Sequence, residues 1–474
     1  MSYSAIESPE YVPGSTHGTR RRSFKSDLHD DTSEETPLIG RAPHGQIIAP
    51  KDKWNIVRWS FLYLGMITML PWNIMLSMPS FWDYKFRNVT LDALNSSISG
   101  QSDLFSDKPT EMQITFPSYL SIASNVPGAI TTIAHSLLGQ RACVRKRIFW
   151  SLAVFFASFG GLLVLSLPNS DKWQDRYLHT VILMVVLLNV GVNVLQGALF
   201  GVSGRFPSIY AGCVMTGQSL GGVLPAIAAI LLTLFDVEPR VLGPVCFCLI
   251  LVSILTAMVI FFGMSNNIYF LYYGEGKVSV DQDIDHNDEV DHICYKAIFK
   301  NSWMYFVTGY INYATTLSVF PAITSLVRSQ VQTHWTRVFF TPVASVLLFN
   351  VGDLIGRTSA TWLQWPGTKR FEQFTLMSVT ILRIAFIPSL MLCNVDVAIR
   401  RHLFTLFHGD VTFCCFILAL GISSGYIGNV SMLMIPKVNE VAIEIQAAAT
   451  LMNSAVVLGI ASGSTAGYFL QDAL

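Results

Sequence analysis

One stretch of the sequence holds an acid and a base inside an otherwise apolar run, FNVGDLIGR at 349–357. Asp353 and Arg357 are four residues apart, so a helix would put both on one face, where they can pair. Asn350 lies three residues before Asp353 and would share that face. A carboxylate accepts hydrogen bonds and a guanidinium donates them, which suits a solute rich in hydroxyl groups. The alternative is a buried pair that only holds two helices together.

A second polar stripe occurs in NVGVNVLQG at 189–197. Asn189, Asn193 and Gln196 recur at the spacing of one helix face in an apolar run. Because an amide both donates and accepts hydrogen bonds, these side chains could bind the edge of a purine or pyrimidine. Hydrogen bonds between neighbouring helices are the alternative.

Aromatic and small residues accompany these polar residues in the apolar runs. In MLPWN, Trp72 offers a flat aromatic face and Asn73 a polar end after the helix-bending Pro71, although an interfacial Trp anchor is an equally simple interpretation. Gly352 and Gly356 have the spacing that lets a neighbouring helix approach closely.

Motifs of enzymes and metal sites are weak. GISSG at 421–425 fits a nucleophile-elbow pattern but lies in an apolar run with no strand before it. The acidic segment at 281–292 resembles a calcium loop, but its sixth and twelfth positions are His286 and His292. We therefore predict no enzyme activity, no metal and no cofactor. The formal net charge of +0 argues against a nucleic-acid partner.

The elements that position these residues follow from composition. Of the 474 residues, 51% are hydrophobic and only 13% are charged, whereas soluble domains carry about 25% charged residues. A helix that crosses a bilayer needs roughly 20 mainly apolar residues. Runs of this length predict an all-α polytopic membrane protein with about eleven transmembrane helices, because backbone groups in lipid must bond within the helix. The predicted spans are 55–78, 113–138, 148–167, 178–201, 208–234, 241–263, 301–327, 338–363, 371–393, 404–434 and 445–470.

The longest break between spans predicts the domain organisation. We expect a disordered cytosolic tail at 1–53, a six-helix bundle at 54–263, a cytosolic acidic linker at 264–300 and a five-helix bundle at 301–474. This six-plus-five division is typical of transporters built from two helical bundles.

Two independent signs predict the orientation. The connector at 139–147 carries Arg141, Arg145, Lys146 and Arg147, so it should face the cytosol. The preceding connector carries Asn88 and Asn95 in glycosylation acceptor sites, which require the opposite side. The N-terminus is then cytosolic and the C-terminus extracellular or lumenal. Arg400 and Arg401 fall on the predicted outer side, against this trend.

Eight short segments, in this order, resemble the equilibrative nucleoside transporter family over about residues 54–470. They are LPWN (70–73), LQGALFG (195–201), GQSLGG (217–222), SVFPA (318–322), FNVGDLIGR (349–357), RIAFIPSLMLCNV (383–395), LFHGD (406–410) and SGYIGN (424–429). The resemblance implies a two-bundle fold related to the major facilitator class. It also implies facilitated transport of nucleosides such as adenosine and uridine by alternating access.

The resemblance also implies roles for individual residues. Asp353 and Arg357 would bind the ribose hydroxyls, Gln196 the base, and Trp72 with Met69 would line the base pocket. Further lining positions are Ile460 and Asn125, the latter where some members have Met. Asn73, Phe320 and Asn350 would lie near the outer gate. At the cytosolic gate Gln446 replaces an acidic residue that pairs across the gate in some members, so the partner of Arg147 stays open, with nearby Glu444 as a candidate.

The tail contains Glu34, Leu38 and Ile39 in an acidic dileucine pattern, which resembles the tail of lysosomal members and would bind adaptor proteins. The plasma membrane and the late endosome or lysosome membrane therefore both stay open as locations. The expected partners are nucleosides and membrane lipid. A carrier of other polar solutes, such as nucleobases or monoamines, and a non-transporting receptor or scaffold are the alternative functions.

Overall fold

The computed structural model describes residues 50–89, 110–138, 143–275, 294–331, 333–395, 403–439, 441–472 and 474. The regular secondary structure of this part of the chain is helical, apart from two isolated β-bridges. Its α-helices are α1 (Ile56–Leu76), α2 (Pro79–Lys85), α4 (Glu111–Leu138), α5 (Val144–Ser166), α6 (Gln174–Ser203), α7 (Ser208–Leu234), α8 (Pro239–Ser265), α9 (Ile268–Phe270), α10 (Tyr295–Val319), α11 (His334–Phe340), α12 (Leu348–Leu363), α13 (Arg370–Leu382), α14 (Phe386–Met391), α15 (Asp410–Val438) and α16 (Ala442–Asp472). The 3-10 or π segments η1 (Lys53–Asn55), η3 (Leu271–Glu275), η4 (Thr341–Leu347) and η5 (Arg383–Ala385) connect or extend them.

The prediction of an all-helical polytopic membrane protein is confirmed. Within the described residues, nine helical stretches are long and apolar enough to cross a bilayer, two of them continuous through η4 and η5. The other two predicted spans coincide with α4 and α10, which are 28 and 25 residues long but do not belong to these nine. Both helices contribute polar residues to the cavity described below.

Two predicted span boundaries are wrong. The span at 301–327 ends early, because α10 stops at Val319 and Phe320, which precedes a proline, adopts an extended conformation. The span at 404–434 begins late, because backbone N–H groups of Leu406 and Phe407 donate to the carbonyl oxygen of Leu392 instead of forming a helix. The helix α15 then starts at Asp410.

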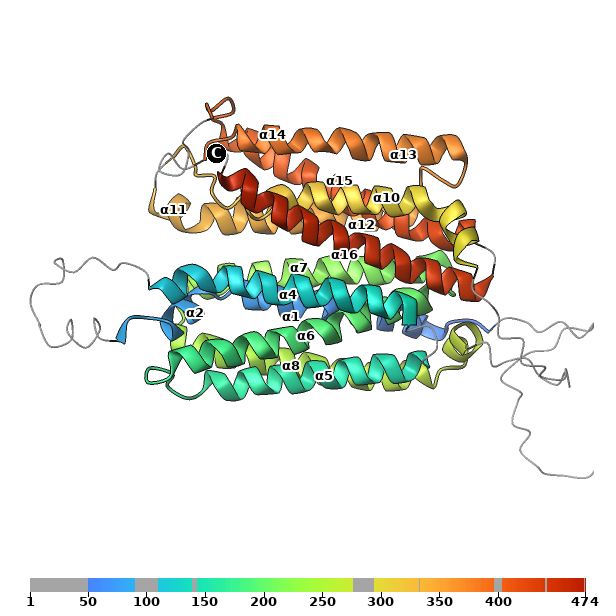
Figure 1. Cartoon of the computed structure of the whole chain (residues 1–474), viewed down its shortest axis with the longest axis horizontal. Coiled ribbons are helices and arrows are strands. Elements are labelled where there is room, and N and C mark those ends of the chain that lie inside the picture. The colour runs from blue at the N-terminus through green and yellow to red at the C-terminus, as the bar shows by residue number, and fades with distance from the viewer. Residues whose placement is uncertain are drawn as a thin grey trace, which may run out of the picture. The chain divides into compact units, whose positions relative to one another are not determined.

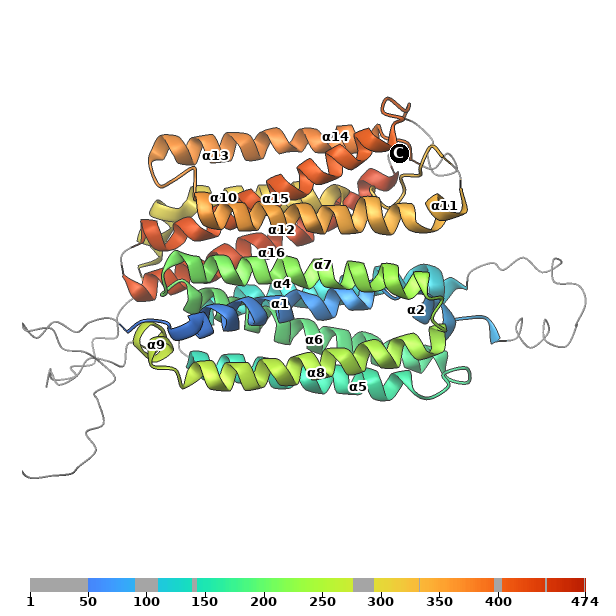
Figure 2. The ribbon, with the colours of Figure 1, turned by 180° about the vertical axis from the view of Figure 1, so that it is seen from behind.

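The helices of residues 50–474 form two groups that lie side by side in both views (Figures 1 and 2). In the first group α1 packs on α7, and α5 packs on α6 and α8. In the second, α12 packs on α15 and α10 on α16. The groups meet where α7 contacts α12 and where α16 contacts α4 and α6. Polar residues of these meeting helices are therefore the ones that can face each other between the groups.

Close backbone contact between α12 and α15 fixes the direction of the predicted acid–base face. A Cβ atom on Gly352 would lie 3.0 Å from the carbonyl oxygen of Leu418, and one on Gly356 would overlap the carbonyl oxygen of Ile422. The predicted packing role of these two glycines is confirmed. Because this stripe faces α15, Asp353 and Arg357 project from another side of α12, toward α7.

Candidate functional site

A cavity of about 270 Å³ lies between the two helix groups. Residues of α1, α4, α6, α7, α10, α12, α15 and α16 line it. Its volume is close to the lower end of small-molecule pockets, about 300 Å³. Nine residues predicted for the binding site or the outer gate are in the lining: Met69, Asn73, Asn125, Gln196, Phe320, Asn350, Asp353, Arg357 and Ile460.

The predicted acid–base pair forms in the wall of this cavity. Arg357 Nε donates a hydrogen bond to Asp353 Oδ2 over 2.8 Å, and the two residues expose only 7% and 6% of their surface. Ser219 Oγ, from α7, donates a second hydrogen bond to the same oxygen over 2.5 Å. A buried carboxyl group is costly unless it is paired and hydrogen-bonded, so these two donors stabilise it and fix its direction.

The guanidinium of Arg357 joins helices of both groups. Its Nη1 donates to the carbonyl oxygen of Met215 over 3.3 Å and to Gln218 Oε1 over 3.1 Å, both on α7. Its Nη2 donates to the hydroxyl oxygen of Tyr313 on α10 over 3.3 Å. These three acceptors are neutral, so Asp353 provides the only negative charge that the described residues place in hydrogen-bonding contact with Arg357.

Two polar groups that line the cavity keep unused hydrogen-bonding capacity. Among the described residues no group donates a hydrogen bond to Asp353 Oδ1, although Oδ2 accepts two. The side-chain amide of Gln196 makes no hydrogen bond within the described part of the chain, and the residue is 5% exposed. A solute in the cavity can therefore gain bonds at both places without breaking existing ones.

The two asparagines of the predicted polar stripe are engaged differently. Asn189 Nδ2 donates to Ser124 Oγ over 3.2 Å, and Asn193 Oδ1 accepts from Thr132 Oγ1 over 2.8 Å. Both partners lie on α4, so these amides form the interhelical bonds that were the alternative interpretation. Of the three stripe residues, Gln196 alone makes no side-chain hydrogen bond within the described residues, so its whole amide is available to a solute.

The other predicted residues lie in the cavity wall, on α1 and at the predicted cytosolic gate. The Phe320 ring stacks on Phe349 in the cavity wall, with ring centroids 4.0 Å apart. Trp72 belongs to α1, but its side chain is outside the described part of the structure. Arg147, in the first turn of α5, contacts His135 Nε2 through Nη1 over 2.9 Å. No ion pair with Glu444, in the first turn of α16, is present among the described residues.

Sequence-based reasoning missed Ser219 and Tyr313. Ser219 lies in GQSLGG, one of the eight segments that resemble the family, but the sequence assigned no contact to its hydroxyl. Tyr313 lies in a run whose mixed polarity resembles any half-buried helix. A hydroxyl within a small-residue stripe is the one available signal, because close packing brings such a hydroxyl near the partner helix.

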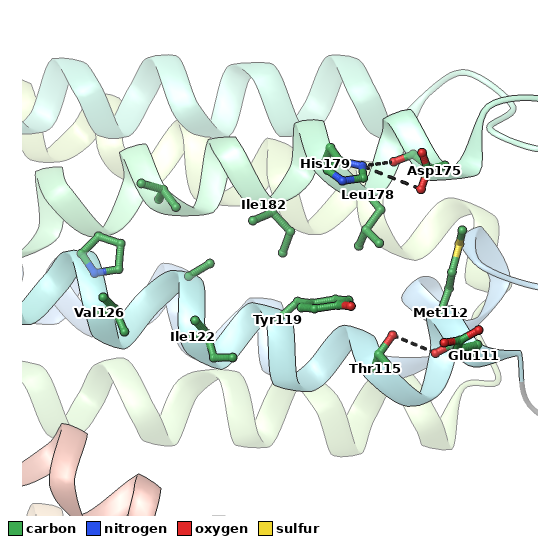
Figure 3. A pocket seen from close by; sticks show the side chains of 13 residues that line it. Glu111, Met112, Thr115, Tyr119, Ile122, Val126, Asp175, Leu178, His179 and Ile182 are labelled. Atoms are coloured by element: carbon green, nitrogen blue, oxygen red, sulfur yellow. Dashed lines mark hydrogen bonds and ion pairs between the residues drawn. The ribbon is translucent and has the colours of Figure 1, made fainter.

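A larger cavity of about 660 Å³ lies between α4 and α6, away from the acid–base pair (Figure 3). Much of its wall is apolar, with Ile122, Val126 and Ile182 among the lining residues. Polar groups gather at one end, where His179 Nδ1 bonds the carbonyl oxygen of its own helix at Asp175. A polar solute would find few partners along this cavity, so size alone does not identify the functional site.

The fold and the cavity define the protein as a multi-pass membrane protein with a polar cavity between two helix groups. In its fold it is similar to the crystal structure of the human organic anion transporter MFSD10 (TETRAN). The TM-score is 0.55 at 11% sequence identity, over 89% of this chain and 95% of that chain. At this identity the likeness shows the fold alone.

Sequence relatives identify the family. The model of the nucleoside transporter family matches residues 182–472. The chain is 26% identical to equilibrative nucleoside transporter 2 of Homo sapiens, over 90% of this chain and 99% of the relative. It is 26% identical to equilibrative nucleoside transporter 3 of Rattus norvegicus (93% and 94% covered) and 26% to equilibrative nucleoside transporter 1 of Homo sapiens (89% and 98%). The chain belongs to the nucleoside transporter family.

Proposed function

We propose that this protein is an equilibrative nucleoside transporter, which moves purine and pyrimidine nucleosides such as adenosine and uridine down their gradient by alternating access. The observation that carries the proposal is the Asp353–Arg357 pair, buried between the helix groups with Asp353 Oδ1 and the Gln196 amide open to the same cavity. Family membership narrows the solute from any hydroxyl-rich compound to nucleosides.

In this proposal each part of the nucleoside has its own partners. Asp353 Oδ1 accepts a hydrogen bond from a ribose hydroxyl, and Arg357 orients the carboxylate while donating to the sugar. Gln196 pairs with the amide edge of the base. Met69, Trp72, Asn125 and Ile460 line the base pocket.

Alternating access requires the six-helix and five-helix bundles to move against each other. Asn73, Phe320 and Asn350 then form the outer gate, and Arg147 and Glu444 belong to the inner one. Arg357 bonds to α7 of the first group and to Tyr313 on α10 of the second, so a solute that changes those bonds changes the contact between the groups. This supports a coupling between binding and movement.

Uptake of radiolabelled uridine and adenosine into proteoliposomes tests the function. We expect saturable uptake that stops when internal and external concentrations are equal, needs no ion gradient, and accelerates when unlabelled nucleoside is inside. Protein-free liposomes are the control. Absence of flux with purified, folded protein, or accumulation above equilibrium, would refute equilibrative transport. Competition by nucleobases and monoamines in the same assay measures the solute range.

For orientation and location we propose a cytosolic N-terminus and an outer connector glycosylated at Asn88 and Asn95. Asn88 is exposed, whereas Asn95 and the dileucine residues Glu34, Leu38 and Ile39 are outside the described residues. Adaptor binding by this motif would direct the protein to late endosomes or lysosomes. Surface biotinylation of Leu38→Ala/Ile39→Ala against wild type decides the location, because only a sorted protein would shift to the plasma membrane. Glycosidase digestion of Asn88→Gln and Asn95→Gln variants decides the orientation.

A further inference from the structure

A small cavity of about 10 Å³ adjoins the main cavity between the helix groups. Gln196, Gln218, Tyr313 and Val456 line both cavities, so the two lie directly against each other. The small cavity is completed by Phe200, Met215, Gly428, Met432, Met452 and Asn453. Its volume corresponds to about one water molecule, so it is too narrow for a solute as it stands. We call it the extension of the main cavity.

The extension points toward one end of the helices. On α6 the main cavity is lined by residues from Leu188 to Gln196, and the small one by Gln196 and Phe200. On α16 the lining moves from Ile460 back to Met452. The C-terminal end of α6 and the N-terminal end of α16 therefore lie in this direction, which is the end that the sequence predicts to be cytosolic.

Of the described residues, Asn453 is the one polar residue that lines the small cavity and does not line the main cavity. The residue is 1% exposed, and neither Oδ1 nor Nδ2 has a hydrogen-bond partner in the described part of the chain. Buried amides without partners are rare in folded proteins and destabilise them. An asparagine kept in this condition beside a cavity is therefore expected to serve a group that arrives from the cavity.

Beyond Asn453 the two helix groups touch closely. Gln446 and Thr450 continue the face of α16 that holds Asn453, at steps of four and three residues. Both contact Gly201 on α6, where a Cβ atom would lie 3.1 Å from Gln446 Cγ and 3.3 Å from Thr450 Oγ1. The seam between α6 and α16 is thus closed here, and a solute can pass only when these helices separate.

We propose that Asn453 forms a second hydrogen-bonding subsite, which binds the base amide or a ribose hydroxyl of a nucleoside as it leaves the main cavity toward the α6–α16 seam. The inference rests on the proposed transport function and adds a step to it. Gln196 lines both cavities, so the polar edge of the solute can form a hydrogen bond with Asn453 before it leaves Gln196. The solute then keeps at least one hydrogen-bond partner during this step. Met215, Met432 and Met452 have flexible side chains that let the narrow extension widen.

The variant Asn453→Leu tests the proposal, because it removes the amide at nearly constant size. A purely structural role predicts unchanged or higher thermal stability and normal transport, since an unpartnered buried amide gives way to an apolar group. Our proposal predicts unchanged or higher stability, a dissociation constant for uridine within threefold of wild type, and a maximal transport rate lower by about tenfold or more. Asn453→Ser, which keeps a hydrogen-bonding group, should recover part of that rate.

Ser454→Ala is the matched control, because the neighbouring hydroxyl donates to the carbonyl oxygen of Thr450 in its own helix and lines neither cavity. It should transport within twofold of wild type. Normal maximal rate in Asn453→Leu, or a loss explained by lower stability or weaker binding, would overturn the subsite while leaving the transport function intact. Absence of flux in wild type would instead overturn the transport function itself.

Discussion

Replacing Asp353 by Asn removes one negative charge and keeps the shape of the side chain. Asp353 Oδ2 accepts hydrogen bonds from Arg357 Nε and Ser219 Oγ, and Oδ1 remains open to the cavity. A hydrogen bond to a charged acceptor contributes about 1.5–3 kcal/mol. Because each 1.4 kcal/mol is a factor of ten, we expect uridine to bind about 10- to 150-fold more weakly to Asp353→Asn.

The same substitution should also lower stability. Breaking a buried ion pair by removing one partner costs about 3–5 kcal/mol. We expect the lower end, because Arg357 keeps its bonds to Met215, Gln218 and Tyr313. A lower melting temperature in detergent is therefore anticipated, and affinities must be measured on the folded fraction.

A pair of substrates separates the binding effect from the stability effect. 2′,3′-Dideoxyuridine lacks the ribose hydroxyls that Asp353 would bind, so wild type should prefer uridine over it by about 10- to 150-fold. In Asp353→Asn this preference should fall to about threefold or less, as in a double-mutant cycle between protein and solute. Competition against labelled uridine binding to purified protein measures all four affinities.

Asp410→Asn is the matched control. Asp410 Oδ2 also accepts a hydrogen bond from a serine, Ser329 Oγ, over 2.6 Å, but Asp410 does not line the main cavity. Its substitution should leave both affinities within twofold. If Asp353→Asn weakens uridine and dideoxyuridine equally, the carboxylate does not contact the ribose hydroxyls, and the proposed sugar site is wrong.

Three further variants probe other contacts. Gln196→Leu should weaken nucleoside binding about 2- to 12-fold, equivalent to one neutral hydrogen bond, while the uridine-to-dideoxyuridine ratio stays at its wild-type value in the competition assay. Gly356→Ala should destabilise the fold by about 1–3 kcal/mol in thermal unfolding, because the new Cβ overlaps the backbone of Ile422; Gly160→Ala, with nothing within 4 Å, should not. Arg383→Leu should lower the melting temperature, because Arg383 donates hydrogen bonds to oxygens of Asn312, Thr316, Leu420 and Ser423. It should leave the transport rate per folded molecule unchanged, because Arg383 lines neither cavity between the helix groups.

The sequence by itself determined the fold class, most helix bounds within a few residues, and the pairing of Asp353 with Arg357 in the site. Hydrophobic length is a local property, so it placed α7 at its observed bounds, 208–234. It gave no warning that α15 starts at Asp410, because the preceding apolar segment is held by hydrogen bonds to Leu392 from elsewhere in the chain. Helical spacing paired Asp353 with Arg357 correctly, since both residues belong to one helix.

Tertiary structure decided what each polar side chain meets. Asn189, Asn193 and Gln196 look alike in the sequence, but α4 supplies partners to the first two and none to the third. Ser219 on α7 is 134 positions from Asp353, and Tyr313 on α10 is 44 positions from Arg357. Helix packing brings both hydroxyl groups to the acid–base pair. Such partners depend on how closely backbones approach, which spacing within one helix cannot encode.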